Sequence, residues 1–297
     1  MRDDVALRRP RRVLVIYNPT AGWRKRRRLM RTLARLERLG CQVELRTTTA
    51  RGDAEAMARA ADPAVFDAVV AAGGDGTINE VLNGLADSPL PLALLPLGTA
   101  NVLAAEIGLT SSPRRVAEAI AQGRLRQVFL GSANGRRFAM MAGVGFDAHV
   151  VQRIDLRLKR MIGRMAYVLG TIAEFWRHRP VSYRVEIDGM TYSAAAVIVA
   201  KGHYYGGKFV VAREARLDEP RLRVALFERA GRWNVLRYTA GLVLGRLDRV
   251  PGLTVLEAER LTIRGPAGDP VQADGDLVAQ LPLSVTLADR PIMLIAG

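Results

Sequence analysis

The chain has 297 residues, 49% of them hydrophobic; this is long for one domain and apolar enough for substantial cores, so a mostly disordered protein is excluded. Its formal net charge of +15 favours an anionic partner such as nucleic acid, nucleotide phosphate or an acidic membrane, although only four of the 44 basic residues are lysines and an arginine bias also arises from genome composition. Cys41 is the only cysteine, which excludes an internal disulfide and a cysteine-rich metal module.

Residues 1–12 form a basic tail. This tail is charged and lacks an apolar stretch, so we expect no signal peptide. The apolar run at 194–200 is too short to cross a bilayer, which takes about 20 residues. The sequence therefore predicts a cytoplasmic protein that meets a membrane only peripherally, from the water side.

The first part of the chain alternates between strand-like and helix-like segments. Continuous apolar runs predict buried strands, and apolar residues spaced three and four apart predict helices. The predicted strands are 13–17, 43–46, 66–72 and 92–95, and the predicted helices lie near 29–36, 53–61 and 78–85. This order is typical of a parallel sheet covered by helices on both faces.

After about residue 128 short strand-like segments dominate. They predict an antiparallel, largely β domain from strands near 138–142, 183–187, 192–200, 222–227 and 261–264. Asp188-Gly189 between two of them is a hairpin signal. A helical stretch at about 150–179 interrupts the early strands and mixes arginines with aromatic and aliphatic residues.

A glycine-rich segment, Gly73-Gly74-Asp75-Gly76-Thr77, joins a predicted buried strand to a predicted helix. Glycines let a backbone approach a phosphate, and a helix N-terminus attracts it. Thr77 and Glu80 have the spacing of a capping box. A carboxylate repels phosphate, so Asp75 fits best if it handles a Mg²⁺ ion that bridges to the phosphates. The alternative is an ordinary strand-to-helix turn without a ligand.

Several segments, in order, resemble the diacylglycerol kinase catalytic-domain family, which includes bacterial diacylglycerol kinases and sphingosine and ceramide kinases. They are 18–22 (NPTAG), 73–81 (GGDGTINEV), 95–101 (LPLGTAN), 142–148 (AGVGFDA) and 274–276 (DGD). Any one of them is weak evidence, but their order is specific. The resemblance covers the chain from about residue 12 to its end.

This resemblance implies a two-domain fold. The first domain would be an α/β nucleotide-binding domain at 12–128, Rossmann-like and similar to NAD kinase and phosphofructokinase. The second would be a C-terminal β-sandwich at 129–290, and residues 291–297 would return to the first domain. It also implies ATP and Mg²⁺ as cofactors and a site in the cleft between the domains.

The same resemblance implies the nucleotide contacts. They are Asn18, Pro19, Thr20, Ala21, Gly22, Thr48, Gly73, Gly74, Asp75, Gly76, Thr77, Ile78, Asn79, Glu80, Thr99 and Asp276. The alternatives are a strand-ending Asn-Pro turn at the first motif and a solvated polar loop at Thr48, which lies between two other threonines.

Phosphoryl transfer to an alcohol needs a base on the hydroxyl, and Asp274 is the residue that the resemblance assigns to it. Asp276 replaces the family's usual glutamate. Asp75 is the second catalytic carboxylate. The alternative at Asp274-Gly275 is a simple β-turn, because Asp-Gly is a common turn pair.

The family also carries a structural Mg²⁺ site in its second domain. The corresponding positions here are Arg216, Glu219 and Arg221, with the arginines offering backbone carbonyls. Glu219 and Pro220 replace the usual Asp-Gly, so a metal-free surface turn is the alternative. Val102 and Phe129 also stand where the family has acidic residues.

These features predict an ATP-dependent kinase that phosphorylates a lipid hydroxyl, on diacylglycerol or a related lipid, at a membrane surface. The stretch 150–179 is either an interfacial segment or a helix packed on the sandwich. A homodimer stays open, and the lack of a nucleic-acid motif argues against nucleic acid as a partner. The alternative functions are a kinase for a soluble substrate, as in NAD kinase, and a catalytically weakened nucleotide- or lipid-binding regulator.

Overall fold

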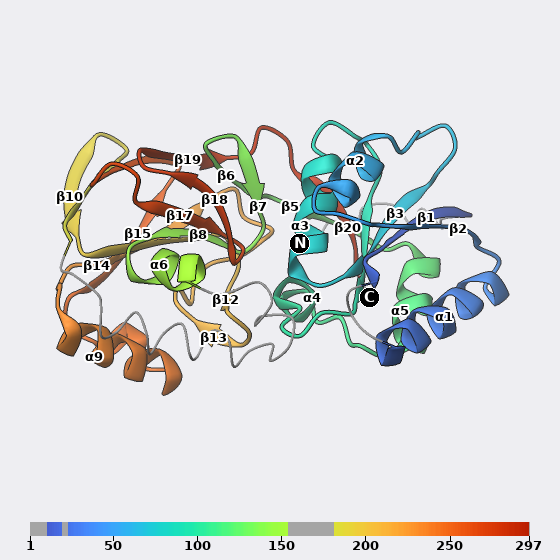
Figure 1. The fold of residues 1–297 in the computed structure, drawn as a ribbon, viewed down its shortest axis with the longest axis horizontal. Coiled ribbons are helices and arrows are strands. Elements are labelled where there is room, and N and C mark those ends of the chain that lie inside the picture. The colour runs from blue at the N-terminus through green and yellow to red at the C-terminus, as the bar shows by residue number, and fades with distance from the viewer. Residues whose placement is uncertain (1–10, 20–22, 154–180, 297) are drawn as a thin grey trace. The chain divides into compact units, whose positions relative to one another are not determined.

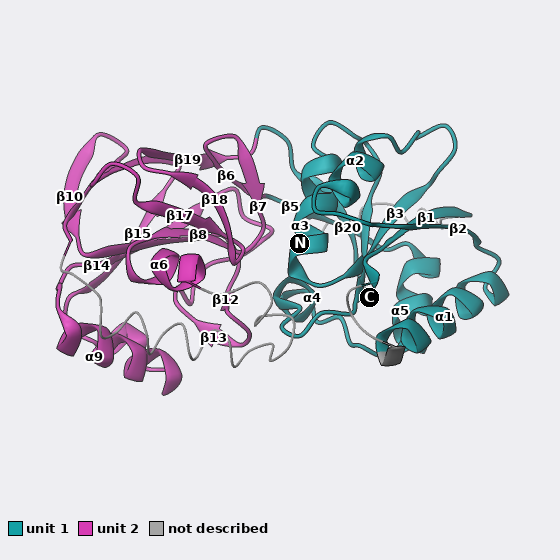
Figure 2. Cartoon of the chain, viewed as in Figure 1, with its two compact units in different colours: residues 1–129, 289–297 teal, residues 130–288 magenta. Residues whose placement is uncertain are grey.

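The computed structural model describes residues 11–19, 23–153 and 181–296 (Figure 1). Thr20, Ala21 and Gly22 lie outside the described residues, as does most of the helical stretch predicted at 150–179. The chain divides into two compact units, which are Met1–Phe129 with Asp289–Gly297, and Leu130–Ala288 (Figure 2).

Unit 1 is built on a six-stranded sheet with the order β2-β1-β3-β4-β20-β5. The first five strands run parallel to their neighbours, and only β5 runs antiparallel, against β20. The strands are β1 (Arg12–Tyr17), β2 (Gln42–Thr47), β3 (Ala68–Gly73), β4 (Leu92–Pro96), β5 (Leu125–Val128) and β20 (Ile292–Ile295). The C-terminal strand thus lies in the sheet of unit 1.

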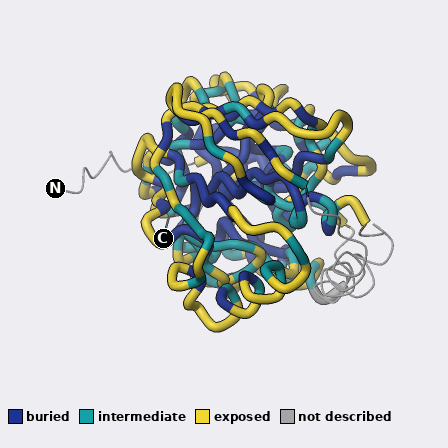
Figure 3. Tube along the Cα trace, turned by 90° about the vertical axis from the view of Figure 1, so that its left-hand side faces the viewer, coloured by how far each residue is buried: buried dark blue, intermediate teal, exposed yellow. Residues whose placement is uncertain are grey.

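Helices cover both faces of this sheet, as the alternating pattern predicted. They are α1 (Trp23–Arg38), α2 (Asp53–Arg59), α3 (Asp75–Gly84), α4 (Val102–Glu106) and α5 (Pro113–Gln122). Leu33 of α1 and Ile120 of α5 pack in one core with Val13 and Val15 of β1. The alternate residues of β1, such as Ile16, are also fully buried, and α2 contacts this strand. Buried segments lie in the interior of the chain and exposed ones at its surface (Figure 3). Burial on both faces explains why the strands are continuous apolar runs.

Unit 2 is a β-sandwich of two six-stranded sheets, with the orders β10-β9-β16-β19-β6-β7 and β15-β14-β11-β8-β17-β18. The first sheet contains β6 (Gly131–Ala133), β7 (Arg136–Phe138), β9 (Tyr183–Ile187), β10 (Met190–Ala194), β16 (Arg260–Arg264) and β19 (Leu283–Leu287). The second contains β8 (Met141–Val144), β11 (Ala196–Ala200), β14 (Leu222–Phe227), β15 (Leu253–Ala258), β17 (Pro270–Ala273) and β18 (Asp276–Gln280). Their pairings are antiparallel, which confirms the predicted fold class.

Smaller elements complete unit 2. They are α6 (Phe146–Arg153), α9 (Arg232–Val243), the 3₁₀ helix η2 (Leu247–Arg249) and the short pair β12 (Tyr204–Tyr205) and β13 (Phe209–Val210). The predicted hairpin between β9 and β10 is confirmed: Asp188 and Gly189 both have positive φ, 45° and 88°, as a type I′ turn requires. Within the described ranges, no helix is both long and apolar enough to span a membrane.

Candidate active site

The sheet of unit 1 reverses its winding at β1. The chain passes from β1 to β2 on one side and then crosses to β3 on the other. In open α/β sheets, ligands bind outside the carboxyl ends of the strands at such a switch point. Asn18 follows β1 and Gly74 follows β3, so the first two predicted nucleotide motifs meet at this place. The Asn18 side chain donates a hydrogen bond to the hydroxyl of Thr77, with Nδ2 and Oγ1 3.2 Å apart.

Glycines bring the second and third motifs into direct backbone contact. The Gly73 carbonyl accepts hydrogen bonds from the N–H groups of Leu97 and Gly98, at 2.8 and 3.1 Å. A Cβ at Gly98 would lie 2.5 Å from the Cα of Gly74, which is closer than real atoms approach. A Cβ at Gly73 would overlap the Thr77 side chain. This region therefore requires glycine for packing, whether or not a ligand binds there.

Helix α3 begins earlier than the capping box predicted. Its N-cap is Gly74, and Thr77 lies in the first turn with its hydroxyl bonded to Asn18. The predicted box is wrong because the extended Gly74 allows the helix to start directly after the strand, and Glu80 accepts a bond from the N–H of Ala54 instead. Within the described residues, no side-chain hydrogen bond caps this N-terminus. The first turn therefore offers its N–H groups and its partial positive charge to an anion.

Asp75 has a structural role that the sequence did not reveal. Its two carboxylate oxygens accept hydrogen bonds from the N–H groups of Asn101 and Val102, at 2.9 and 2.7 Å. These groups form the N-terminus of α4, so the carboxylate caps that helix and ties the second motif to the third. These two hydrogen bonds explain why the glycine-rich segment 73–77 contains a carboxylate, without invoking a metal. Binding of Mg²⁺ by Asp75 stays a prediction.

The remaining predicted nucleotide residues divide into two groups. Thr48 is buried at the end of β2, where its N–H donates to the carbonyl of Tyr17, and Thr99 is exposed in the third loop. Both lie at the carboxyl ends of strands, in the same sheet as Asn18. Ile78 and Asn79 are buried within α3. Their burial favours a role in packing over a role in nucleotide binding.

A test of the glycine packing is Gly98→Ala. We expect ATP affinity to fall about tenfold or more, because overpacking costs about 1–3 kcal/mol and would separate Gly98 from Gly74. Titration calorimetry with ATP measures the effect. Gly40→Ala is the control for general backbone strain: its positive φ of 86° makes the alanine costly for stability, but the space around it is open, so ATP affinity should stay unchanged. Equal ATP affinities of the wild type and Gly98→Ala would contradict this role.

The predicted base, Asp274, lies in unit 2 at the tip of the β17–β18 hairpin. Asp274 and Gly275 have φ values of 50° and 82°, so the two-residue turn also exists. The Asp274 side chain turns back onto the strand edge and accepts hydrogen bonds from the N–H groups of Ala139, Met140 and Met141, at 2.8, 2.9 and 3.1 Å. These bonds fix the orientation of the carboxylate. Asp276 is the first residue of β18, directly after the turn.

A buried network supports this turn. Asp147 of α6 accepts hydrogen bonds from the hydroxyl of Tyr205 and from Nε2 of Gln272, the latter at 2.6 Å. The other end of the Gln272 amide accepts from the N–H of Gly275 at 3.0 Å. Burial raises the pKa of Asp147, and the two hydrogen bonds oppose that rise. Sequence reasoning missed Gln272, which has no motif around it.

The raised pKa of Asp147 makes a pH-dependent prediction. The ionised carboxylate is less favourable in the folded protein than in the unfolded chain. Asp147 therefore contributes fully to the free energy of unfolding below its unfolded pKa of about 4, and this contribution is lost as pH rises through its higher pKa in the folded protein. An asparagine at position 147 has nearly the same shape as the aspartate but does not ionise, so Asp147→Asn should not lose stability as pH rises. We expect this variant to gain stability over the wild type as pH rises from about 4 to about 8. Urea unfolding at several pH values measures the free energy of unfolding of both proteins, and Asp289→Asn, at an exposed position, is the control. A difference in this free energy between the wild type and Asp147→Asn that does not change with pH would contradict the prediction.

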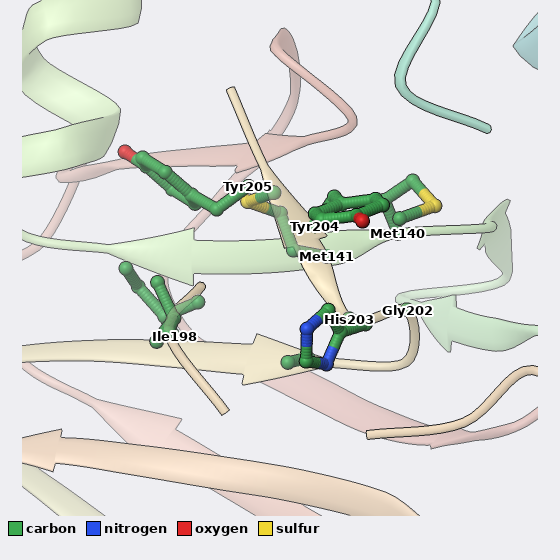
Figure 4. Close-up of a pocket in the computed structure, with 9 residues that line it drawn as sticks. Met140, Met141, Ile198, Gly202, His203, Tyr204 and Tyr205 are labelled. Carbon is green, nitrogen blue, oxygen red and sulfur yellow. The ribbon is translucent and has the colours of Figure 1, made fainter. Parts of the chain in front are cut away.

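An apolar pocket lies on the same side of unit 2. Its lining includes Met140 and Met141, whose N–H groups bind Asp274, and Tyr204 and Tyr205 of β12 (Figure 4). Tyr204 and Tyr205 belong to the short antiparallel pair β12–β13. The structure places them beside the segment that holds Asp274.

Two cationic side chains, the buried Lys201 and the exposed Arg216, bond to backbone carbonyls of the loop predicted to bind a second Mg²⁺. The Lys201 side chain is fully buried, and its ammonium donates a hydrogen bond to the carbonyl of Arg216. The Arg216 guanidinium donates to the carbonyls of Arg213 and Ala215, at 2.8 and 3.0 Å. Of the predicted ligand atoms, the Arg216 carbonyl is thus already held by a positive charge of this chain.

The predicted carboxylate ligand is also engaged with cations. Glu219 lies 3.9 Å from the guanidinium of Arg223, and Arg221 pairs with Glu257 and Glu259 at 3.3 and 2.6 Å. Within the described ranges, no three His, Cys, Asp or Glu side chains come together as a metal site. A divalent ion beside the Lys201 ammonium would be repelled, so these residues do not fit the metal.

Comparisons with known proteins agree with this geometry. Residues 12–133 match the family "Diacylglycerol kinase catalytic domain", and residues 140–296 match "YegS C-terminal NAD kinase beta sandwich-like domain". The chain is 29% identical to a diacylglycerol kinase of Bacillus subtilis over 281 residues, covering 92% of each chain. It is 26% identical over 291 residues to one from Staphylococcus aureus, covering 96% of this chain and 92% of that protein.

Solved structures show the same fold. A putative diacylglycerol kinase from Bacillus anthracis superposes with a TM-score of 0.82 at 22% identity, over 99% of this chain and 98% of that one. Two family matches together span nearly all of the chain. The protein belongs to the diacylglycerol kinase catalytic domain family, with a C-terminal domain of the YegS type.

Proposed function

We propose that this protein is an ATP-dependent lipid kinase that transfers the γ-phosphate of ATP to a lipid hydroxyl, on diacylglycerol or a related lipid. The observation that carries the proposal is the switch-point site of unit 1, where a helix N-terminus without a side-chain cap follows glycines packed to backbone contact. It occurs in a chain of a kinase family whose relatives in Bacillus and Staphylococcus are named diacylglycerol kinases.

Unit 1 would hold the nucleotide. The N–H groups of the first turn of α3 suit its phosphates, and the Asn18–Thr77 hydrogen bond fixes the first motif against that turn. Mg²⁺ bound with ATP would neutralise charge on the phosphates. Asp75 is the carboxylate of this loop that we assign to that ion, and the N–H groups of Asn101 and Val102 hold it in one orientation.

Unit 2 would hold the acceptor. Asp274 would take the proton of the lipid hydroxyl as the hydroxyl oxygen bonds to the γ-phosphorus, while the bond between that phosphorus and the β,γ-bridging oxygen breaks and ADP leaves. Backbone N–H groups set the direction of its carboxylate, so no side-chain motion is needed. The side chains of Met140 and Tyr204 line an apolar pocket that has no room for a water molecule as it stands, so they would have to move for the alkyl part of a lipid to enter. The lipid itself would stay in a membrane that the protein meets peripherally on the cytoplasmic side.

The test is a set of acceptors with ATP, comparing lipid vesicles with soluble alcohols including NAD⁺. We expect phosphate transfer to a lipid and none to NAD⁺. The second candidate is an NAD kinase-like enzyme, which the NAD kinase-like description of the C-terminal domain favours. Phosphorylated NAD⁺ with unchanged lipids would select it. ATP binding without any transfer would select the weakened regulator.

A further inference from the structure

Helix α9 lies along unit 2 and was missed by sequence reasoning (Figure 1). One side of it is anchored. The ring of Tyr238 packs edge-on against Phe227, and its hydroxyl donates to the carbonyl of Gly252 at 2.7 Å. Gly241 lies so close to Val250 that a Cβ would come within 2.5 Å of the Val250 side chain. The orientation of α9 on unit 2 is therefore fixed.

The opposite side is apolar and exposed. Trp233, Leu236, Val243 and Leu244 are 79%, 47%, 62% and 70% exposed, and we call these four residues the α9 face. Their spacing of three, seven and one residues places them along a single side of the helix. A contiguous group of large apolar side chains on one surface marks an interaction site.

Positive charge borders the α9 face. Arg232 and Arg237 are exposed within the helix, and no acidic residue occurs in its sequence. Arg246 and Arg249 follow it, both exposed. The nearby Asp248 pairs with Arg213 at 3.1 Å, so its charge is compensated. The surroundings of the face are therefore positive.

We propose that the α9 face docks this protein on an anionic lipid bilayer, with α9 lying in the plane of the interface. Apolar and aromatic side chains on one face with arginines beside them are the features of interfacial helices. The exposed Phe209 of β13, a strand that packs near α9, adds a second aromatic group. The proposal rests on the proposed function, because a lipid kinase must reach a substrate held in a membrane.

A second copy of the chain fits this face less well. A two-fold dimer sets one patch against itself, so the exposed Arg237, Arg246 and Arg249 would approach the same three arginines of the second copy. An anionic bilayer supplies the opposite charge along the whole face.

The test is co-sedimentation of the full chain with phosphatidylglycerol or phosphatidylcholine vesicles, without ATP. We expect binding to phosphatidylglycerol vesicles that weakens with salt, and about tenfold weaker binding of Trp233→Ser/Leu244→Ser. Met190→Ser is the matched control, since Met190 is 61% exposed on β10. Arg232→Glu/Arg237→Glu should lose binding to a similar degree, whereas Arg184→Glu/Arg264→Glu, at exposed positions of the other sheet, should not.

Binding by Trp233→Ser/Leu244→Ser equal to that of the wild type would overturn the proposal. So would a wild-type dimer that this double variant converts to a monomer, because a second copy would then cover the face. The assay needs no turnover, so vesicle binding through α9 by a protein that phosphorylates no lipid would count against the proposed function alone. Kinase activity on detergent-dispersed lipid should be unchanged in Trp233→Ser/Leu244→Ser, and a loss there would also contradict a docking role.

Discussion

Replacing Asp274 with asparagine is expected to lower kcat for lipid phosphorylation by about 10²–10⁴-fold, the usual contribution of a general base. ATP affinity should not change, because the three motifs that meet at the switch point lie in unit 1, and the predicted nucleotide contact in unit 2 is Asp276, which this variant keeps. Initial rates with vesicle-bound lipid and calorimetry with ATP measure the two effects separately.

This substitution also has a structural cost. An asparagine NH₂ group would face at least one of the N–H groups that now donate to the carboxylate, at a cost of about 1–3 kcal/mol. Asp188→Asn is a matched control within the same unit. Asp188 also opens an Asp-Gly turn with positive φ, and its carboxylate accepts N–H bonds from Glu259 and Arg260. Normal turnover of Asp274→Asn, or an equal loss in Asp188→Asn, would remove Asp274 from the base role.

Replacing Lys201 with methionine is expected to destabilise the protein by about 1–3 kcal/mol, because the buried carbonyl of Arg216 would lose its charged donor. The midpoint of thermal unfolding should fall by several degrees. In the absence of nucleotide, the wild-type midpoint should not respond to EDTA or to added Mg²⁺, because the ammonium already supplies the positive charge of the loop. Calorimetry of both proteins under these conditions measures this.

Lys208→Met is the control for Lys201→Met, since Lys208 is exposed in the same segment. It should leave the midpoint unchanged. A wild-type midpoint that falls with EDTA and recovers with Mg²⁺ would show that a divalent ion holds the loop, and would restore the metal site predicted at Arg216, Glu219 and Arg221.

The fold was predictable because its signals are local. Continuous apolar runs such as Val13–Tyr17 mark strands buried on both faces, and Asp188-Gly189 marks a hairpin by its backbone preferences. Helix α9 was missed although Trp233, Leu236 and Leu244 have helical spacing. Apolar residues at helical spacing are expected to face a core, but those of α9 are exposed. The sequence pattern alone does not distinguish the two cases.

The meeting of the glycine motifs was predictable, because their requirement is a property of the backbone, and phosphate binding there stays a prediction. The partners of Asp75 and Asp274 could not be read from sequence, since each carboxylate binds N–H groups far away in the chain. The hydrogen bond between the Lys201 ammonium and the Arg216 carbonyl also joins residues distant in the chain and could not be read from sequence. This buried positive charge argues against the second metal site that the sequence predicted.

The most direct test of the account is to incubate the protein with γ-labelled ATP, Mg²⁺ and vesicles that contain diacylglycerol, and then to separate lipids from soluble products. The account predicts label in the lipid fraction as a phosphomonoester, retained by Asp188→Asn and lost by Asp274→Asn. Label that appears only on a soluble acceptor, or an unlabelled lipid fraction across a broad set of lipid alcohols, would contradict a lipid kinase.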